Sequence, residues 1–151
     1  MQTFTELGLR DAIQKNLDAA GHTTPTEIQA LALPEALAGR DLIACAQTGG
    51  GKTAVFALPI LNKLQHSDGR APRALILVPT RELAVQVETQ FALYGKGTGL
   101  RGTAIYGGAG MGQQVAKLRR GVDIIVATPG RLFDHLEQGC VDLSEIEMFV
   151  L

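Results

Sequence analysis

The sequence contains no tryptophan, and aromatic residues make up only 5% of its 151 residues. The core of the protein must therefore be mostly aliphatic. Long hydrophobic runs are also missing, and none approaches the 18 or more residues that a membrane-spanning helix needs. The first ten residues, MQTFTELGLR, lack the basic-then-apolar layout of a signal peptide. We therefore expect a cytoplasmic protein that does not associate with membranes.

Cysteine is scarce, and so is charge of one sign. Cys45 and Cys140 lie far apart, with no C-x-x-C pair and no histidine at ligand spacing, which indicates a reduced protein without a structural metal. The formal net charge is −1, so the chain as a whole does not attract polyanions. Any contact with nucleic acid must come from a local cluster of cations.

Hydrophobic residues are plentiful, at 46%, and a chain of this length is most simply one domain. Short, nearly continuous apolar segments predict strands that are buried on both faces, as in a parallel sheet covered by helices. These expected strands are 41–45, 74–78, 102–106, 123–127 and 147–151. Helices are expected at 9–20, from the capping residue Thr24 to about Ala38, and at 52–64, 81–94, 112–120 and 130–138. This alternation predicts an α/β fold, a three-layer sandwich with helices on both faces of a mostly parallel sheet.

Three consecutive glycines stand between the expected strand 41–45 and the helix that begins near Lys52. In that context the stretch from Ala46 to Thr53 resembles a phosphate-binding P-loop. Glycine lets backbone N–H groups approach phosphate oxygens closely, and the helix N-terminus adds positive charge. Lys52 can reach the outer phosphates, and the hydroxyl of Thr53 can hold Mg²⁺. The alternative is a flexible glycine-rich turn without a ligand.

Further motifs in the right order narrow the choice among P-loop proteins. GHTTPTEIQ (21–29) resembles the Q motif of DEAD-box RNA helicases, AQTGGGKT (46–53) resembles their motif I, and PTRELAVQ (79–86) resembles motif Ia. YGG (106–108) matches their glycine doublet and TPGR (128–131) matches motif Ib. The chain is thus similar to the N-terminal RecA-like lobe of that family, with residues 1–40 as a helical segment packed on a lobe formed by 41–151.

The resemblance implies a site for ATP or ADP with Mg²⁺. Gln29 would read the N6 and N7 edge of adenine, which an amide side chain can pair with twice. Phe4 would stack on the base, and His22 stands where the family usually has an aromatic residue. Lys52 and Thr53 would serve catalysis, with Thr53 holding the metal ion. The implied nucleotide-binding residues are Phe4, His22, Thr24, Gln29, Ala46, Gln47, Thr48, Gly49, Gly50, Gly51, Lys52 and Thr53.

The resemblance also implies contacts with the backbone of RNA, without sequence preference. Two expected strands end where a helix begins, so backbone N–H groups, a hydroxyl and an arginine come together, which suits a phosphate. The implied RNA-binding residues are Pro79, Thr80, Arg81, Gly107, Gly108, Thr128, Pro129, Gly130 and Arg131. The alternative is two well-capped helices with surface arginines. KLRR (117–120) has a weaker case, because cations at a helix C-terminus also suit the helix dipole.

In the family, the strand that matches 147–151 leads into Asp-Glu-Ala-Asp, and this sequence ends at Leu151. We therefore expect a parent protein with RNA-dependent ATPase and duplex-unwinding activity and a second RecA-like lobe. We expect the 151 residues alone to be monomeric and to bind adenine nucleotide without turnover. A P-loop ATPase unrelated to RNA is a more distant alternative, against which the Q motif argues.

Overall fold

A computed structural model describes residues 3–67, 69 and 71–151. The chain forms two compact units, one made of residues up to Gln65 with Gln90–Thr98, and the other of His66–Thr89 with Gly99–Leu151. The boundary expected between residues 40 and 41 falls inside the first unit. Within the described ranges, no helix is both long and apolar enough to cross a membrane.

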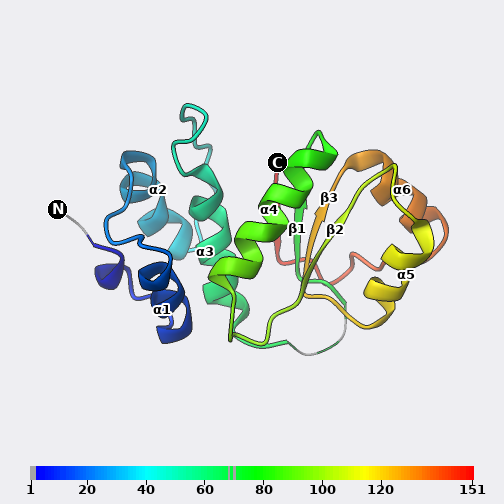
Figure 1. Ribbon diagram of the computed structural model, residues 1–151, viewed down its shortest axis with the longest axis horizontal. Coiled ribbons are helices and arrows are strands. Elements are labelled where there is room, and N and C mark those ends of the chain that lie inside the picture. The colour runs from blue at the N-terminus through cyan, green and yellow to red at the C-terminus, as the bar shows by residue number, and fades with distance from the viewer. Residues whose placement is uncertain (1–2, 68, 70) are drawn as a thin grey trace. The chain divides into compact units, whose positions relative to one another are not determined.

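The first unit is helical. It contains a short 3₁₀ helix η1 (Phe4–Leu7) and the helices α1 (Asp11–Ala19), α2 (Glu27–Leu37) and α3 (Lys52–Leu64) (Figure 1). The periodic apolar residues Ile13 and Leu17 of α1 are buried, as the four-residue spacing predicted. The bounds of all three α-helices agree with the expected ones to within a few residues, whereas η1 was not predicted.

Helix α2 begins two residues later than expected, because its N-cap is Thr26 and not Thr24. The sequence holds two overlapping capping boxes, Thr24 with Glu27 and Thr26 with Gln29. The second is used, and the Oε1 atom of Gln29 accepts a hydrogen bond of 3.0 Å from the backbone N–H of Thr26. The Thr26 hydroxyl also donates to the carbonyl oxygen of Gly50 over 2.8 Å, a long-range contact that local sequence could not reveal.

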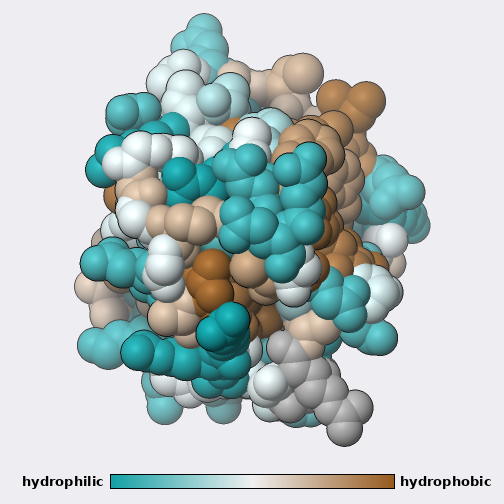
Figure 2. Space-filling model, turned by 90° about the vertical axis from the view of Figure 1, so that its right-hand side faces the viewer, coloured by the Kyte–Doolittle hydropathy of each residue, from teal (hydrophilic) through white to brown (hydrophobic). Residues whose placement is uncertain are grey.

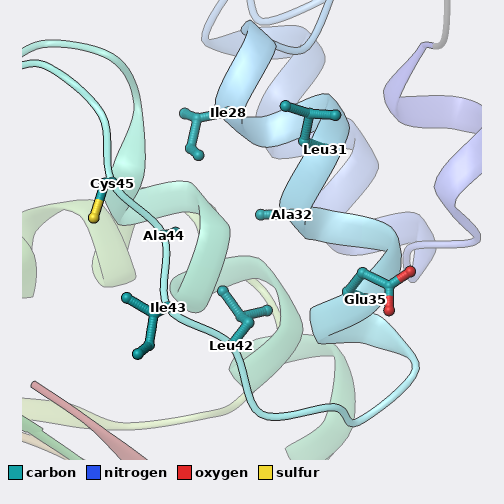
Figure 3. A pocket seen from close by; sticks show the side chains of 8 residues that line it. All are labelled: Ile28, Leu31, Ala32, Glu35, Leu42, Ile43, Ala44 and Cys45. Carbon is teal, nitrogen blue, oxygen red and sulfur yellow. The ribbon is translucent and has the colours of Figure 1, made fainter.

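The expected strand at 41–45 is wrong. These residues run as an extended segment beside α2 and take no part in the strand pairings (Figure 3). Ile43 is 96% exposed, and Leu42 and Leu31 are exposed as well. Together with Ile28 of α2, they line a shallow apolar hollow. An apolar run predicts a tendency to be buried, but a strand forms only where a neighbouring strand supplies hydrogen-bond partners.

The second unit is built on a parallel sheet. Its strands β1 (Ala74–Leu77), β2 (Gly102–Ile105), β3 (Ile124–Ala127) and β4 (Met148–Val150) lie in the order β2-β3-β1-β4. The four strands agree with expected segments, and every pairing in the described sheet is parallel. The helices α4 (Arg81–Tyr94), α5 (Met111–Arg119) and α6 (Pro129–Glu137) follow β1, β2 and β3 in turn (Figure 1). The chain therefore has the predicted α/β fold with a parallel sheet.

One face of the sheet is covered by α5 and α6. Alternate strand residues such as Leu75 and Ile125, which are register partners, belong to a buried cluster with Leu132 of α6. Leu118 of α5 and Leu136 of α6 pack against the same cluster. This cluster is entirely aliphatic, in keeping with the shortage of aromatic residues.

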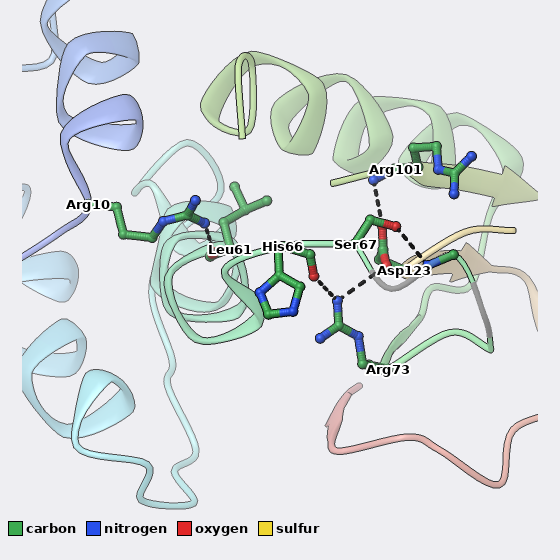
Figure 4. Close-up of polar contacts among 8 residues, drawn as sticks. Arg10, Leu61, His66, Ser67, Arg73, Arg101 and Asp123 are labelled. Atoms are coloured by element: carbon green, nitrogen blue, oxygen red, sulfur yellow. Dashed lines mark hydrogen bonds and ion pairs between the residues drawn. The ribbon is translucent and has the colours of Figure 1, made fainter. Parts of the chain in front are cut away.

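The amino ends of three strands are tied together by Asp123, which is 1% exposed. Its carboxylate accepts a hydrogen bond of 2.8 Å from the backbone N–H of Arg101, before β2. It also pairs with the guanidinium of Arg73, before β1, over 3.2 Å (Figure 4). A buried carboxylate is tolerated because both of its oxygens have donors.

Strand β2 lies at one edge of the sheet, and a side chain covers part of that edge. The carbonyl oxygen of Ile105 accepts from Thr128, next to β3, so the neighbouring residue Ala104 directs its N–H away from β3. The Oε1 atom of Glu88, on α4, accepts this N–H over 3.1 Å.

Candidate nucleotide and phosphate sites

The glycine-rich stretch forms a tight turn that leads into α3. Gly49 and Gly51 have φ angles of 84° and 83°, which side chains rarely adopt, and Gly51 is the N-cap of the helix. The backbone N–H of Gly50 donates to the carbonyl oxygen of Gln47 over 3.0 Å. A Cβ atom at Gly50 would lie only 3.0 Å from that same oxygen. All three glycines are therefore required by the backbone as it is folded here.

Two side chains at the start of α3 can serve a bound phosphate. Lys52 is exposed, and its Nζ atom donates to the carbonyl oxygen of Ala46 over 2.6 Å, so the ammonium group lies against the loop. Thr53 follows directly and is partly exposed. The free N–H groups of the first helical turn and a nearby cation are the components of an anion site.

Gln29 lies against this loop and is 7% exposed. Its Nε2 atom donates to the carbonyl oxygen of Gly51 over 3.0 Å, while its Oε1 atom is held by Thr26. A Cβ atom at Gly51 would overlap the Gln29 amide nitrogen. The structure thus brings Gln29 and the glycine loop into direct contact.

The other residues implied for base binding are arranged differently. Phe4 is 2% exposed, so in this conformation its ring offers no face to a base. His22 is exposed and makes an edge-to-face contact with Tyr94, with ring centroids 6.2 Å apart. Thr24 is exposed and precedes the cap of α2. Of the remaining loop residues, Gln47 and Thr48 are exposed and Ala46 is partly buried.

A second group of implied residues lies at the carboxyl edge of the sheet. Because β1, β2 and β3 are parallel, the segments that follow them lie at the same edge. The exposed members of this group are Pro79, Thr80, Arg81, Gly107, Gly108, Pro129 and Gly130. The hydroxyl of Thr80 accepts the N–H of Leu83, and Thr128 is the N-cap of α6 with Pro129 in its first turn, so both expected helix starts are present.

Arg81 and the glycine doublet come together at this edge. The guanidinium carbon of Arg81 lies 5.0 Å from the centre of the Tyr106 ring, a cation–π arrangement. A Cβ atom at Gly108 would lie 3.5 Å from Nη1 of Arg81, and Gly108 itself has a φ angle of 77°. Residues that follow β1 and β2 therefore meet beyond the end of the intervening strand β3.

Arg131 is only 14% exposed, and its contacts within the protein involve a residue that sequence reasoning missed. Its Nη1 atom donates to the carbonyl oxygen of Ala109 over 2.9 Å and to Oε1 of Gln114 over 3.3 Å. Gln114 is buried, and the same Oε1 atom lies 2.9 Å from Nε2 of His135. One signal was available, since Gln114 is four residues before the core residue Leu118 and so lies on the buried side of α5.

His135 is fully buried, and burial lowers the pKa of its imidazole, with the positive charge of Arg131 lowering it further. The carboxylate of Asp134 acts in the opposite direction and is the smallest of the three effects. The imidazole is therefore neutral at pH 7. Its Nδ1 atom has no hydrogen-bond partner among the described residues.

The KLRR segment (117–120) lies near the amino ends of the strands, opposite the carboxyl edge. The last turn of α5 holds Lys117 and Arg119, and the chain then enters β3 at its amino end. The carboxyl-edge residues are at the opposite ends of the strands, so the cations of KLRR are separate from the group around Arg81. Figure 2 shows the side on which α5 and α6 lie in Figure 1, and hydrophilic residues cover much of that side.

Comparisons with known proteins identify the relatives of this chain. The family model of the DEAD/DEAH box helicase matches residues 26–151. An ATP-dependent RNA helicase DeaD of Klebsiella pneumoniae is 47% identical over 152 residues, which cover 99% of this chain and 23% of that protein. Another DeaD helicase, of Mycobacterium tuberculosis (strain ATCC 25618 / H37Rv), is 45% identical over 150 residues, covering 99% and 26%. The DEAD-box ATP-dependent RNA helicase 52A of Oryza sativa subsp. japonica is 44% identical over 163 residues, covering 98% and 27%. The chain spans about a quarter of the length of these relatives.

Proposed function

The chain belongs to the DEAD/DEAH box helicase family, and we propose that it forms the ATP-binding and RNA-contacting lobe of an ATP-dependent RNA helicase. The observation that carries the proposal is the contact between Gln29 and Gly51, over 3.0 Å. It puts a side chain that can read a base against a loop that can hold phosphates. A nucleotide carries a base and phosphates on one molecule, so a single ligand could contact both groups.

Gln29 can pair with adenine without giving up its contacts. An amide nitrogen has two N–H donors and an amide oxygen has two lone pairs. One N–H donor of Gln29 is used by the carbonyl oxygen of Gly51, and one lone pair of its oxygen is used by the N–H of Thr26. The remaining donor and acceptor suit N7 and N6 of adenine, whereas guanine presents two acceptors at the corresponding edge.

The phosphates would be held by the glycine loop and the N-terminus of α3. Backbone N–H groups there have no helical acceptors of their own. Lys52 is exposed, and we expect its ammonium group to leave the Ala46 carbonyl oxygen for the outer phosphates. The Thr53 hydroxyl would ligate Mg²⁺, which neutralises phosphate charge when it is bound.

The RNA would cross the carboxyl edge of the sheet. Arg81 and the N-termini of α4 and α6 offer charge and N–H donors, and Gly107 and Gly108 leave room for a backbone. Such contacts position a strand without reading its bases. A second RecA-like lobe elsewhere in the parent protein is a further part of the proposal, supported by the family resemblance. We also propose a monomeric state of this chain and a cytoplasmic location.

A second candidate function is adenine-nucleotide binding without turnover by these 151 residues alone. Phosphoryl transfer relies on metal charge and on residues that position the attacking water. In this candidate the glycine loop, Lys52 and Gln29 bind the nucleotide, and groups from elsewhere in the parent protein complete the chemistry.

The proposal is tested by nucleotide binding and phosphate release. Lys52→Ala should weaken ADP and ATP binding by roughly 10- to 150-fold, since a charge-assisted contact is lost. Lys63→Ala, in the last turn of the same helix, is the matched control and should change nothing. Unchanged binding in Lys52→Ala would overturn the phosphate site. Steady-state phosphate release with saturating single-stranded RNA decides between the candidates, and turnover of about 1 per second or more that vanishes in Lys52→Ala would exclude the second.

A further inference from the structure

Gln114 makes an unusually full set of contacts for a buried side chain. It is 6% exposed, and its Nε2 atom donates to the carbonyl oxygen of Tyr106 over 2.9 Å. Its Oε1 atom accepts from Arg131 over 3.3 Å and from His135 over 2.9 Å. A carbonyl oxygen only accepts and a guanidinium only donates, so the amide can have only one orientation.

The same reasoning determines which ring nitrogen of His135 carries the proton. Oε1 of Gln114 can only accept, so Nε2 of His135 carries the hydrogen. Within the described structure the Nδ1 atom has no partner, and a second proton there would be a buried N–H without an acceptor. His135 therefore acts as a neutral donor that fixes the position of the Gln114 oxygen.

Gln114 and Arg131 hold the glycine doublet from both sides. Gln114 binds the carbonyl oxygen before the doublet, that of Tyr106, and Arg131 binds the carbonyl oxygen after it, that of Ala109. Between these two anchors lie Gly107 and Gly108, which have the most backbone freedom of any residue type. Because Gln114 also contacts Arg131, loss of the Gln114 amide would remove the hydrogen bond at Tyr106 and weaken the one at Ala109.

We propose that Gln114 is a positioning residue, which holds the Gly107–Gly108 loop and Arg131 in the arrangement that binds a nucleic-acid phosphate. This inference rests on the proposed contact between RNA and the carboxyl edge. Gln114 touches no ligand itself. It keeps the binding arrangement populated, and apparent affinity falls in proportion to that population.

The test compares Gln114→Met with Gln113→Met in the 151-residue chain. Methionine has a similar length and no hydrogen bonds, and Gln113 is the exposed neighbour on the same helix. Binding of fluorescent single-stranded oligouridine RNA should weaken about tenfold in Gln114→Met, as expected if one molecule in ten keeps the arrangement. ADP affinity should be unchanged in both variants, and Gln113→Met should bind RNA like the original chain.

A third variant separates positioning from folding. Leu118→Ala removes packing from the same helix without touching the loop. Under conditions where all variants are folded by circular dichroism, Leu118→Ala should keep its RNA affinity. The slope of log K against log salt should stay constant in Gln114→Met, because the molecules that bind keep every phosphate contact, whereas Arg81→Ala should make the slope shallower by about 0.7.

The outcomes are distinguishable. If the original chain binds RNA, Arg81→Ala weakens that binding and Gln114→Met does not, the inference is wrong while the proposed function stands. An equal loss of RNA affinity in Gln114→Met and Leu118→Ala would also overturn it, because it would reduce Gln114 to a folding residue. If the original chain binds no RNA at low salt, the proposed function fails and the inference fails with it.

Discussion

The side-chain nitrogen of Gln29 lies 3.0 Å from the carbonyl oxygen of Gly51, so the start of α2 and the start of α3 are joined by a single amide. Gly51 must be glycine for two separate reasons. Its φ angle of 83° disfavours any side chain, and a Cβ atom would overlap the Gln29 amide nitrogen. A change in the conformation of the loop would therefore move Gln29, and a ligand held by Gln29 would restrict the loop.

The first prediction concerns the choice of base. Adenine nucleotides should bind more tightly than guanine nucleotides by roughly 5- to 150-fold, because one bidentate contact discriminates by about 1–3 kcal/mol. The preference should disappear in Gln29→Ala. Titrations of ADP and GDP measure this preference. Taking the ratio of the two affinities cancels any loss of affinity that the variant causes for both nucleotides. Gln113→Ala is the control. Equal affinities in the original chain would refute the role of Gln29.

The second prediction concerns salt. About three phosphate contacts, from the group formed by Arg81, Gly108, Thr128 and Arg131, predict a slope of log K against log salt near −2 on a single strand. Arg81→Ala should make the slope shallower by about 0.7. Arg119→Ala, in KLRR at the opposite edge of the sheet, should leave it unchanged. A slope several times steeper that responds to Arg119→Ala would show that the binding surface has been misplaced.

The third prediction concerns the stability of the second unit. Asp123→Ala should lower the free energy of unfolding by about 3–5 kcal/mol, because it leaves Arg73 without its buried carboxylate and the Arg101 N–H without an acceptor. Asp123→Asn should cost less, since its oxygen still accepts one hydrogen bond. Urea denaturation measures both. Asp41→Ala, on the surface, should change stability by less than about 0.5 kcal/mol, and a similar small effect at Asp123 would contradict the structure.

The fourth prediction concerns pH. The pKa of His135 is lowered by burial and by Arg131, so the unfolded chain takes up its proton at a higher pH than the folded chain does. The stabilisation from neutral His135 is therefore complete above the ordinary value of 6.5. It is lost as the pH falls from there toward the lowered pKa, and it is constant below that.

The test of this prediction compares unfolding in urea at pH 7.5 and pH 5 for the original chain and two variants. His135→Gln should lose less stability over this range than the original chain does, since it has no proton to take up. His66→Gln, which changes an exposed histidine, should show the original loss. If His135→Gln were as sensitive to pH as the original chain, the neutral buried imidazole would be ruled out.

Sequence periodicity predicted the elements well wherever local pattern and tertiary environment agree. The bounds of α4 and α3 match the expected ranges, 81–94 and 52–64. The expected strand 41–45 failed because strand formation depends on a neighbour, which a local pattern cannot represent. The start of α2 was misplaced for a related reason, since two capping boxes overlap and the contact between Thr26 and Gly50 decides between them.

In the candidate sites, too, features set by consecutive residues were predictable and features set by tertiary contacts were not. The glycine loop and the starts of α4 and α6 were predictable because each depends on consecutive residues. Gln114 was not identified, because its partners Tyr106, Arg131 and His135 are distant in sequence. A glutamine on the buried side of a polar helix was a signal of a hydrogen-bond network, but it could not indicate which groups the network joins. The burial of Phe4 is likewise a tertiary property.

The hydrogen bond between Glu88 and Ala104 has a consequence for how this protein behaves at high concentration. An open edge of a sheet is a template on which another chain can add a strand, and fibrils grow in that way. The carboxylate of Glu88 occupies an N–H that an added strand would need, and its negative charge repels a second copy that approaches with the same group. Replacing Glu88 by valine would remove both obstacles. Aggregation would then appear as turbidity and loss of protein on storage, even if a freshly purified sample bound its ligands normally.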